Sequence, residues 1–537
     1  MTVGIAVPLA PLSPAPQSSP PLSLPRWLLI AGLGSLLVRG WIALTLPITG
    51  DEAFFYWWGV YPDWGYYDHP PMVGWLIGAM RAVLGDTLWA IRLPVLLLPI
   101  ALGGLLWRAL AAVDRTRAAW AVLLFWLAPI NWLNVLITTD TPLIFWSVAS
   151  ACSLLLADRR PRLDGRAWGL YALSGVLLGA AFLSKYFAVV LGFAYLVHFV
   201  LFRRDRFAAF ALLLLCALPG PAINIAWNMD HCWSNIMFNL INRNAGEVFT
   251  WKKPATYVGM MVYLVSPVAA WLSWKHRADL GVAFKAHRLL GCLVVVPLLF
   301  FALLSVKKLI GLHWVMSFYP FGFAFIALGL PAHRLKACAV GLAVLTGLHV
   351  IAVAGISMTP MERWKSTPIY KGIVRSVKTD EMLKQVDAPG VVLMSNAYTA
   401  ASTYGYAQRR YVPVFGRGNF HARQDDLLVD FSVYQGRTIR VILTHRPDLD
   451  DYRPYFDSVE LLTYTQNQME FYAVEGQGFN YEAYRTGVLA DIHRRYYRIP
   501  AWLPLRACPF CERLCGTARC DLADAPASSD KPEPDER

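Results

Sequence analysis

Long apolar runs separated by short polar connections fill the first two-thirds of the chain, and charged residues become frequent only after Thr359. Because a helix needs about 20 apolar residues to cross the hydrocarbon core of a bilayer, these runs predict transmembrane helices. By this length we expect about eleven spans. They cover residues 27–47, 88–110, 118–135, 140–157, 168–184, 186–202, 207–227, 256–274, 289–306, 313–331 and 337–358. The sequence therefore predicts an α-helical polytopic membrane protein.

The composition supports this class. Charged residues make up 16% of the 537 positions, whereas a soluble domain carries about 25%. The formal net charge of +13 comes mostly from the loops between the apolar runs. Such loops favour contact with anionic membrane lipids, so we expect no nucleic-acid partner.

Lysine and arginine concentrate in alternate loops, within residues 108–117, 159–166, 203–206, 275–288 and 334–336. The positive-inside rule places these loops in the cytoplasm. The N-terminus is then cytoplasmic, and an odd number of spans puts the C-terminal region outside, which in a bacterium is the periplasmic side of the inner membrane. Residues 1–26 contain seven prolines and no basic run before Arg26. They are typical of a disordered cytoplasmic tail and not of a signal peptide.

Six basic residues are expected on the opposite, outer face, against this preference. Lysine at helix ends often extends its ammonium to the membrane surface, which explains any one of them. As a group they indicate an anionic ligand at the outer surface, with phosphate the obvious candidate. The six are Lys185, Arg243, Lys252, Lys253, Lys307 and Lys308.

The first outer loop, residues 48–87, has the character of an active site. Asp51 and Glu52 directly follow the first span, at a depth where a carboxylate requires a wet cavity or a partner. The aromatic run 54–58 suits a helix lying in the membrane interface. Asp68 and His69 precede Pro70 and Pro71, which places two ionisable groups at a helix start. A passive aromatic belt with solvated acids would account for the rings, but not for Asp68 and His69.

These residue types suit one kind of chemistry. Transfer of a sugar from a lipid phosphate needs a base for the acceptor and cations for the departing phosphate. An aspartate is ionised at neutral pH and can take the acceptor proton, and lysine, arginine or histidine can stabilise the leaving phosphate. No glycine-rich nucleotide fingerprint follows a strand in this sequence.

Short motifs in a fixed order point to a family. They are Gly50-Asp51-Glu52-Ala53, Asp68-His69-Pro70-Pro71, Thr138-Thr139-Asp140-Thr141-Pro142, Leu183-Ser184-Lys185-Tyr186, His313-Trp314 with Tyr319-Pro320, Ser395-Asn396-Ala397-Tyr398 with Ala401-Ser402, and Gly416-Arg417-Gly418-Asn419. With these motifs the chain, up to about residue 475, resembles the bacterial members of the protein O-mannosyltransferase and lipid A aminoarabinose transferase superfamily. These are integral membrane glycosyltransferases of the GT-C fold.

The resemblance implies a catalytic role for three acids. Asp51 would be the base, Asp140 a second acid that catalyses or positions, and Glu52 a helper or a helix cap. His69 stands where many relatives have a lysine that contacts the donor phosphate, and because histidine is only partly charged at neutral pH, Lys185 could supply the fixed charge. The other donor-phosphate candidates are Arg243, Lys307, Lys308 and His313, and the substrate-cavity candidates are Tyr56, Asp68 and Tyr186.

The resemblance also implies the substrates. The donor would be a sugar on a polyprenyl phosphate, displaced directly with inversion. The acceptor would be lipid A, another lipid, a glycan or a protein of the cell envelope. A divalent metal is possible, and no other cofactor is implied.

Residues 359–500 change to short strands and helices, with strands expected at 391–394, 440–443, 459–463 and 471–474. They predict a small α/β domain on the outer face, after a membrane domain of residues 27–358. The tail, residues 501–537, carries Cys508, Cys511, Cys515 and Cys520. We expect two disulfides there, with a zinc cluster as the alternative. The other five cysteines are expected to be packing residues, and residues 521–537 to be disordered.

Two other classes of function stay open at this stage. A flippase for a lipid-linked sugar would also have many spans and basic residues, but it predicts ionisable groups at mid-membrane and an internal repeat, neither of which is evident. A non-catalytic subunit of an envelope complex would not need Asp51, Asp140 and Lys185 together.

Overall fold

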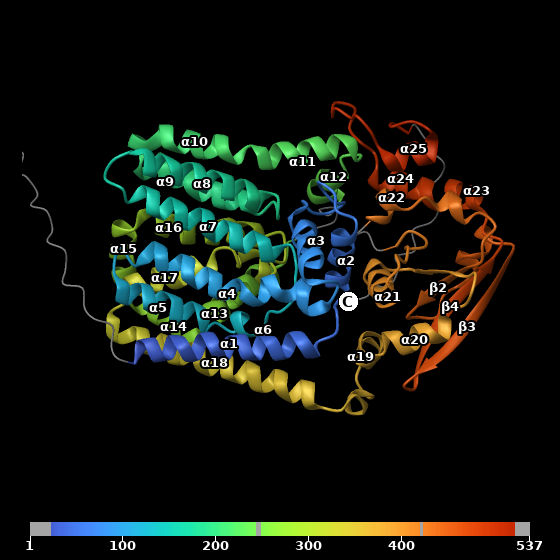
Figure 1. Ribbon diagram of the computed structural model, residues 1–537, viewed down its shortest axis with the longest axis horizontal. Coiled ribbons are helices and arrows are strands. Elements are labelled where there is room, and N and C mark those ends of the chain that lie inside the picture. The colour runs from blue at the N-terminus through green and yellow to red at the C-terminus, as the bar shows by residue number, and fades with distance from the viewer. Residues whose placement is uncertain (1–22, 243–248, 419–422, 521–537) are drawn as a thin grey trace, which may run out of the picture.

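The computed structural model describes residues 23–242, 249–418 and 423–520. It consists of a bundle of long helices and a smaller C-terminal domain with a sheet at its far side (Figure 1). Two shorter helices, α2 (Gly50–Val60) and α3 (Met72–Leu84), lie between the bundle and the C-terminal domain. Helical bundle and small sheet domain together confirm the expected fold class. The disordered tails expected at 1–26 and 521–537 lie, except for Ser23 to Arg26, outside the described residues.

Six helical stretches in the described part of the chain are long and apolar enough to cross a membrane. They are α1 (Leu24–Thr45), α4 (Leu88–Leu110), α7 (Asp140–Asp158), the continuous stretch Arg204–Asp230 that contains α10 (Phe207–Ala217) and α11 (Pro219–Asp230), α16 (Arg288–Ser305) and α18 (Ala332–Met358). Shorter helices complete the bundle: α5 (Arg115–Trp126), α6 (Ile130–Leu133), α8 (Gly165–Phe182), α9 (Ala188–Phe202), α12 (Ser234–Leu240), α13 (Lys252–Val265), α14 (Pro267–Lys275), α15 (Arg277–Ala286) and α17 (Tyr319–Gly329).

Helices lie at all eleven expected positions, but the count of eleven spans is not confirmed. The segment expected at 256–274 is two helices, α13 and α14, which meet at a bend of 96°. Ser266 has a positive φ of 73° and its side chain caps α14 through the N–H of Ala269, while Pro267 starts that helix. Because proline cannot continue a preceding helix, the helix ends here, although the apolar run continues.

The basic loops cap helix ends. Arg117 donates to the carbonyl oxygens of Ala327, at 2.8 Å, and Leu330, at the end of α17. Arg203 pairs with Asp158 at 2.6 Å, at the end of α7. Cations at helix C-termini satisfy carbonyl groups and the helix dipole, so these loops fasten neighbouring helices together.

The C-terminal domain has a four-stranded sheet of β1 (Val392–Ser395), β2 (Ile439–Leu443), β3 (Ser458–Gln466) and β4 (Met469–Gln477). The strand order is β1-β2-β4-β3, with β1 parallel to β2 and the other pairs antiparallel. Asn467 and Gln468 turn the β3–β4 hairpin with positive φ, as a tight two-residue turn requires. The helices are α19 (Tyr370–Val377), α20 (Thr379–Val386), α21 (Tyr398–Gln408), α22 (Asp425–Leu428), α23 (Tyr481–Tyr484), α24 (Ala490–Tyr496) and α25 (Pro509–Cys515). All four expected strands form.

The aromatic helix α2 forms as expected, but its expected exposure to the membrane interface is wrong. Residues 54–58 are all buried, at 7% exposure or less. Their partners belong to the protein: Tyr56 packs edge-on to Tyr406 at 4.8 Å, and Trp57 donates to the carbonyl oxygen of Ser402 at 3.2 Å. The rings that a membrane interface would accept are used here to join the bundle to α21.

Candidate active site

A cavity of about 290 Å³ lies where the first loop meets the C-terminal domain. Its volume is at the lower end of the range for small-molecule sites. The segment after α1 and the start of α2 supply one wall, the segment before α7 a second, and α19 with α21 the third. The lining residues are Ile48, Thr49, Gly50, Asp51, Leu136, Thr138, Arg375, Ser376, Thr399, Ala400, Thr403 and Tyr404.

Asp51 is held at this cavity by the start of α2. Thr49 caps the helix: its hydroxyl accepts from the N–H of Glu52, and the Glu52 side chain accepts from the N–H of Thr49. Gly50 lies against α21, where an added Cβ would be 2.6 Å from the Cβ of Thr399. Only glycine permits this approach of the two elements, so Gly50 sets how closely the C-terminal domain covers Asp51.

The Asp51 carboxylate is exposed to the cavity, yet protein surrounds the cavity on several sides. Because the surrounding protein desolvates the carboxylate, the pKa of Asp51 is raised. The hydroxyl of Tyr398 donates to Oδ1 of Asp51 at 3.3 Å and acts in the opposite direction, and the nearby charge of Glu52 raises the pKa further. A carboxylate with a raised pKa is a better proton acceptor than an ordinary aspartate.

Glu52, by contrast, is buried at 0% exposure in an ion pair with Arg92, also at 0%. Its Oε2 accepts from Nη2 of Arg92 at 2.7 Å, and its Oε1 accepts from Nε of Arg92 at 2.9 Å and from the N–H of Ile137 at 3.2 Å. Arg92 also donates to carbonyl oxygens at the end of the first span, including that of Ala43 at 2.8 Å. The capping role expected for Glu52 is confirmed. The same group joins α2, α4 and the segment before α7.

Asp140 and Lys185 form a second ion pair. Nζ of Lys185 lies 2.9 and 3.0 Å from the two oxygens of Asp140, and the side chains are 12% and 10% exposed respectively. Asp140 starts α7, two residues after Thr138 of the cavity wall. Lys185 lies between α8 and α9. The two family motifs 138–142 and 183–186 therefore meet in one contact, which sequence spacing alone does not predict.

Asp68 and His69 of the first loop, and Tyr186 before α9, are held by residues of α11 and α12 and by contacts within the loop. Nδ1 of His69 contacts the carbonyl oxygen of Asp68, and the imidazole stacks against Phe55 at 6.3 Å. Asn239 donates to the same carbonyl oxygen of Asp68 at 2.9 Å. The hydroxyl of Tyr186 bonds to Asn224 at 2.9 Å and to Asn235.

Tyr56 lies on another face of α2, where its hydroxyl donates to Asp86 at 2.8 Å beside Arg409. The described lining of the cavity does not include Tyr56, Asp68 or Tyr186. Their assignment to a substrate cavity stays a prediction.

The late cationic candidates lie at the end of α16 and in the following segment. Nζ of Lys253 donates to the carbonyl oxygen of Lys307 at 2.6 Å, so these two expected outer-face lysines are neighbours. Lys307 and His313 are exposed, and Lys308 is half-buried. None of the three is among the described residues that line the cavity. Arg243 lies outside the described residues.

Sequence reasoning missed two arginines. Arg375 of α19 lines the cavity that Asp51 lines, is half-buried, and has no ion-pair partner in the described part of the chain. It sits in the charged region after the last span, where no motif distinguishes it from its neighbours. Arg92 lies inside an apolar run, and an arginine within a transmembrane segment is itself a signal of a buried partner.

The cysteines correct one expectation and confirm part of another. Cys515 pairs with Cys520, as a disulfide within the tail. The second disulfide joins Cys508 to Cys232, so the expectation that Cys232 is a packing residue is wrong. Cys511 is left as a buried thiol. Among the described residues, the cluster that could hold a metal is Cys232, Cys508 and Cys511, and it contains none of the cavity-lining residues.

Comparison with known proteins supports this reading of the fold. Residues 68–227 match the family described as dolichyl-phosphate-mannose-protein mannosyltransferase. The chain is 30% identical over 190 residues to lipid A galacturonosyltransferase RgtD of Rhizobium johnstonii, a match that spans 34% of this chain and 38% of the relative.

Solved structures extend the likeness to most of the chain. The crystal structure of ArnT from Cupriavidus metallidurans bound to undecaprenyl phosphate has a TM-score of 0.59 at 12% identity, covering 84% of this chain and 98% of ArnT. The apo form of ArnT gives 0.58 at 13% identity, with the same coverage. The resemblance to GT-C membrane glycosyltransferases is thus confirmed for the fold.

Proposed function

We propose that this protein transfers a sugar from a polyprenyl-phosphate donor to an acceptor of the cell envelope, with Asp51 as the base. The observation that carries the proposal is the position of Asp51, an exposed carboxylate of raised pKa in a cavity between the membrane bundle and the C-terminal domain. A lipid-linked donor and a lipid acceptor both carry their reactive groups at the membrane surface. A cavity at the junction of the bundle and the C-terminal domain can receive both.

In this mechanism Asp51 takes the proton of the acceptor hydroxyl while the oxygen of that hydroxyl attacks the anomeric carbon of the donor sugar. The bond from that carbon to the lipid phosphate breaks, and the configuration is inverted. Tyr398 orients the carboxylate by its hydrogen bond. Glu52 does not exchange protons in this scheme, since Arg92, Ile137 and Thr49 occupy its oxygens.

Cations hold the departing phosphate. Lys185 is the strongest of the expected candidates, because Asp140 keeps its ammonium in a fixed place. His69 and His313 stay candidates from the family resemblance, and Lys307, Lys308 and Arg243 stay candidates from their expected place on the outer face. We add Arg375, a cationic residue that lines the cavity.

Two relatives favour the lipid-linked reading. The matched curated relative is named for galacturonosyl transfer to lipid A, and one matched structure holds undecaprenyl phosphate. We therefore favour a lipid acceptor of the lipid A type over a protein or a glycan. By the distribution of basic loops, the protein would lie in a bacterial inner membrane with its N-terminus in the cytoplasm and its C-terminal domain in the periplasm.

The test is transfer by the purified chain in proteoliposomes that contain a polyprenyl-phosphate-linked radiolabelled sugar and lipid A. The wild type should form glycosylated lipid. Asp51→Asn should lower the rate by about 10²–10⁴-fold, the usual contribution of a general base. Asp380→Asn is the matched control, because Asp380 is an exposed acid of α20 outside the cavity.

Two outcomes would reject the proposal. Full transfer by Asp51→Asn would remove Asp51 as the base. Movement of the labelled carrier between leaflets without a glycosidic product, by wild type and variant alike, would favour the flippase.

A further inference from the structure

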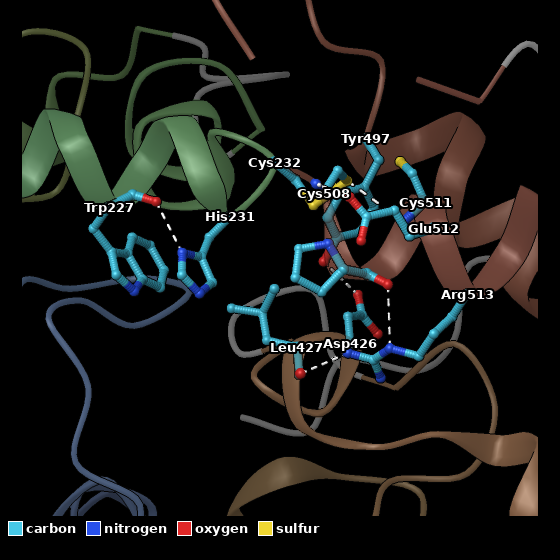
Figure 2. The surroundings of a disulfide bond; sticks show 11 residues. Trp227, His231, Cys232, Asp426, Leu427, Tyr497, Cys508, Cys511, Glu512 and Arg513 are labelled. Carbon is cyan, nitrogen blue, oxygen red and sulfur yellow. Dashed lines mark hydrogen bonds between the residues drawn. A yellow bond between two sulfur atoms is a disulfide. The ribbon is translucent and has the colours of Figure 1, made fainter. Parts of the chain in front are cut away.

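Three cysteine sulfurs meet where the tail crosses the corner between α11 and α12 (Figure 2). Cys232 of this corner is bonded to Cys508, 276 positions away in sequence. The thiol of Cys511 is buried beside them, and the three sulfurs lie within 4.8 Å of one another. The backbone N–H of Cys511 also donates to Sγ of Cys508, at 3.4 Å. A buried thiol therefore stands next to a disulfide that links two distant parts of the chain.

The corner and the tail would stay together without the disulfide. The N–H groups of Arg506 and Ala507 donate to the carbonyl oxygen of Met229 at 2.8 and 3.2 Å. Nε1 of Trp233 donates to the carbonyl oxygen of Pro504 at 2.8 Å, and Arg506 pairs with Asp230 at 2.6 Å. These contacts keep the three sulfurs near one another whichever two are bonded.

We propose that Cys232, Cys508 and Cys511 form a thiol–disulfide exchange site. The thiolate of Cys511 attacks Sγ of Cys508, the bond between Cys508 and Cys232 breaks, and a bond between Cys508 and Cys511 forms. Cys232 leaves as a thiolate and takes up the proton that Cys511 gave up. Neither an oxidant nor a reductant is consumed, since one disulfide replaces another.

The spacing of the cysteines supports this alternative bond. Cys508 and Cys511 are separated by Pro509 and Phe510, a Cys-x-x-Cys arrangement that disulfide oxidoreductases use in both bonded and open forms. Cys515 and Cys520 already satisfy each other, so Cys511 is the one tail cysteine without a disulfide. Burial raises the pKa of the Cys511 thiol to about 12, so the thiol is protonated at neutral pH and attacks only after it loses its proton.

The exchange would remove the covalent link between the tail and a corner that holds the first loop. From α12, Asn235 donates to the carbonyl oxygen of Tyr66 at 2.7 Å, and Asn239 to that of Asp68 at 2.9 Å. The disulfide of Cys232 fixes the start of this helix to the tail. Bond exchange would therefore change how firmly Tyr66 and Asp68 are held.

Mapping of the bonds by mass spectrometry tests the proposal on the full chain in detergent. Trypsin cuts after Arg506 and Arg513, so Cys508 and Cys511 share the peptide 507–513. In the resting protein this peptide should be linked to the peptide that carries Cys232. In non-reducing buffers of increasing pH, which raises the thiolate fraction of Cys511, it should appear free of Cys232 and lighter by two hydrogens, while Cys232 becomes open to alkylation.

Cys511→Ser should abolish the light form, while Cys216→Ser, at a half-buried thiol elsewhere in the chain, should leave it unchanged. If Cys232 stays linked to the peptide 507–513 in every buffer, the exchange is rejected. It is also rejected if the reduced protein takes up one zinc ion that protects all three thiols from alkylation, since that result assigns the cluster to a metal. Because the readout is a bond map, the result stands apart from the success or failure of the proposed sugar transfer.

Discussion

Two neighbouring acids of α2, Asp51 and Glu52, face opposite surroundings. Asp51 points into a cavity, is exposed there, and accepts one hydrogen bond from Tyr398 that is 3.3 Å long. Glu52 is fully buried, and both of its oxygens are bonded to Arg92. The sequence presents the two as a pair, but the helix directs them to different partners.

This difference separates a reactive group from a structural one. A carboxylate that must take a proton needs access, and it accepts a proton more readily when its pKa is raised; Asp51 is exposed to the cavity and has a raised pKa. A carboxylate whose lone pairs are all engaged stabilises what it binds, and Glu52 binds α4, the first loop and the segment before α7. The predictions below test whether the two roles are really distinct. The loss of transfer by Asp51→Asn is the largest effect expected.

Glu52→Gln should unfold the protein more easily instead of removing a chemical step. The change leaves the buried charge of Arg92 without its counter-charge, which typically costs about 3–5 kcal/mol of stability. Thermal unfolding in detergent, followed by a fluorescent thiol probe, should show a clear drop in the midpoint. Asp51→Asn is the matched control and should leave the midpoint close to that of the wild type.

The opposite result would show that Asp51 and Glu52 do not have distinct roles. If Glu52→Gln is as stable as the wild type and loses transfer as fully as Asp51→Asn, then Glu52 takes part in the chemistry. Replacing Arg92 as well, with methionine, would then not restore the lost rate.

Lys185→Met should lower kcat/KM by about a hundredfold, as loss of one cation at a developing negative charge does. Asp140→Asn should have a smaller effect, because Lys185 keeps its charge and loses only its fixed position. The double variant should be no better than Lys185→Met alone. Steady-state rates at several donor concentrations measure this, with Lys384→Met at an exposed site of α20 as the control.

A purely structural ion pair predicts a different pattern. In that case both single variants lose stability and the double variant regains it, with no separate change in the KM for the donor. Such an outcome would place the Asp140–Lys185 pair in the same class as Glu52–Arg92.

Much of the architecture is predictable from the sequence, because hydropathy and turn residues determine it locally. The helix positions, the C-terminal sheet and the capping by Glu52 follow from such local patterns. The bend at Ser266 did not follow from hydropathy, since a positive φ leaves no apolar signal. Burial of the aromatic run 54–58 depends on α21, about 345 positions later, and no local pattern contains that contact.

The candidate site shows the same limit. Asp51, Asp140 and Lys185 carry motifs, so the sequence identifies them, although it does not join Asp140 to Lys185. Arg375 and the bond between Cys232 and Cys508 depend on segments far apart in the chain, and neither Arg375 nor Cys232 lies in a motif. What the sequence predicts least is which distant segments meet.

Tyr398→Phe should have the smallest effect and should shift the pH profile without removing activity. Asp51 must be ionised to act as a base, so transfer is lost as the pH falls through its pKa. Burial already raises that pKa, and the hydrogen bond from Tyr398 lowers it. Without the hydroxyl the pKa rises further, so the acid limb of kcat/KM should move to higher pH by about 0.4–1 unit, the equivalent of one hydrogen bond. The plateau at higher pH should change little, because the phenylalanine ring still packs edge-on to Phe54 as Tyr398 does at 5.1 Å.

Tyr406→Phe, on the same helix but against Tyr56, should leave the limb in place. An acid limb that does not move in Tyr398→Phe would mean that the titrating group is not Asp51. Asp51 would then no longer differ from Glu52 as the reactive acid.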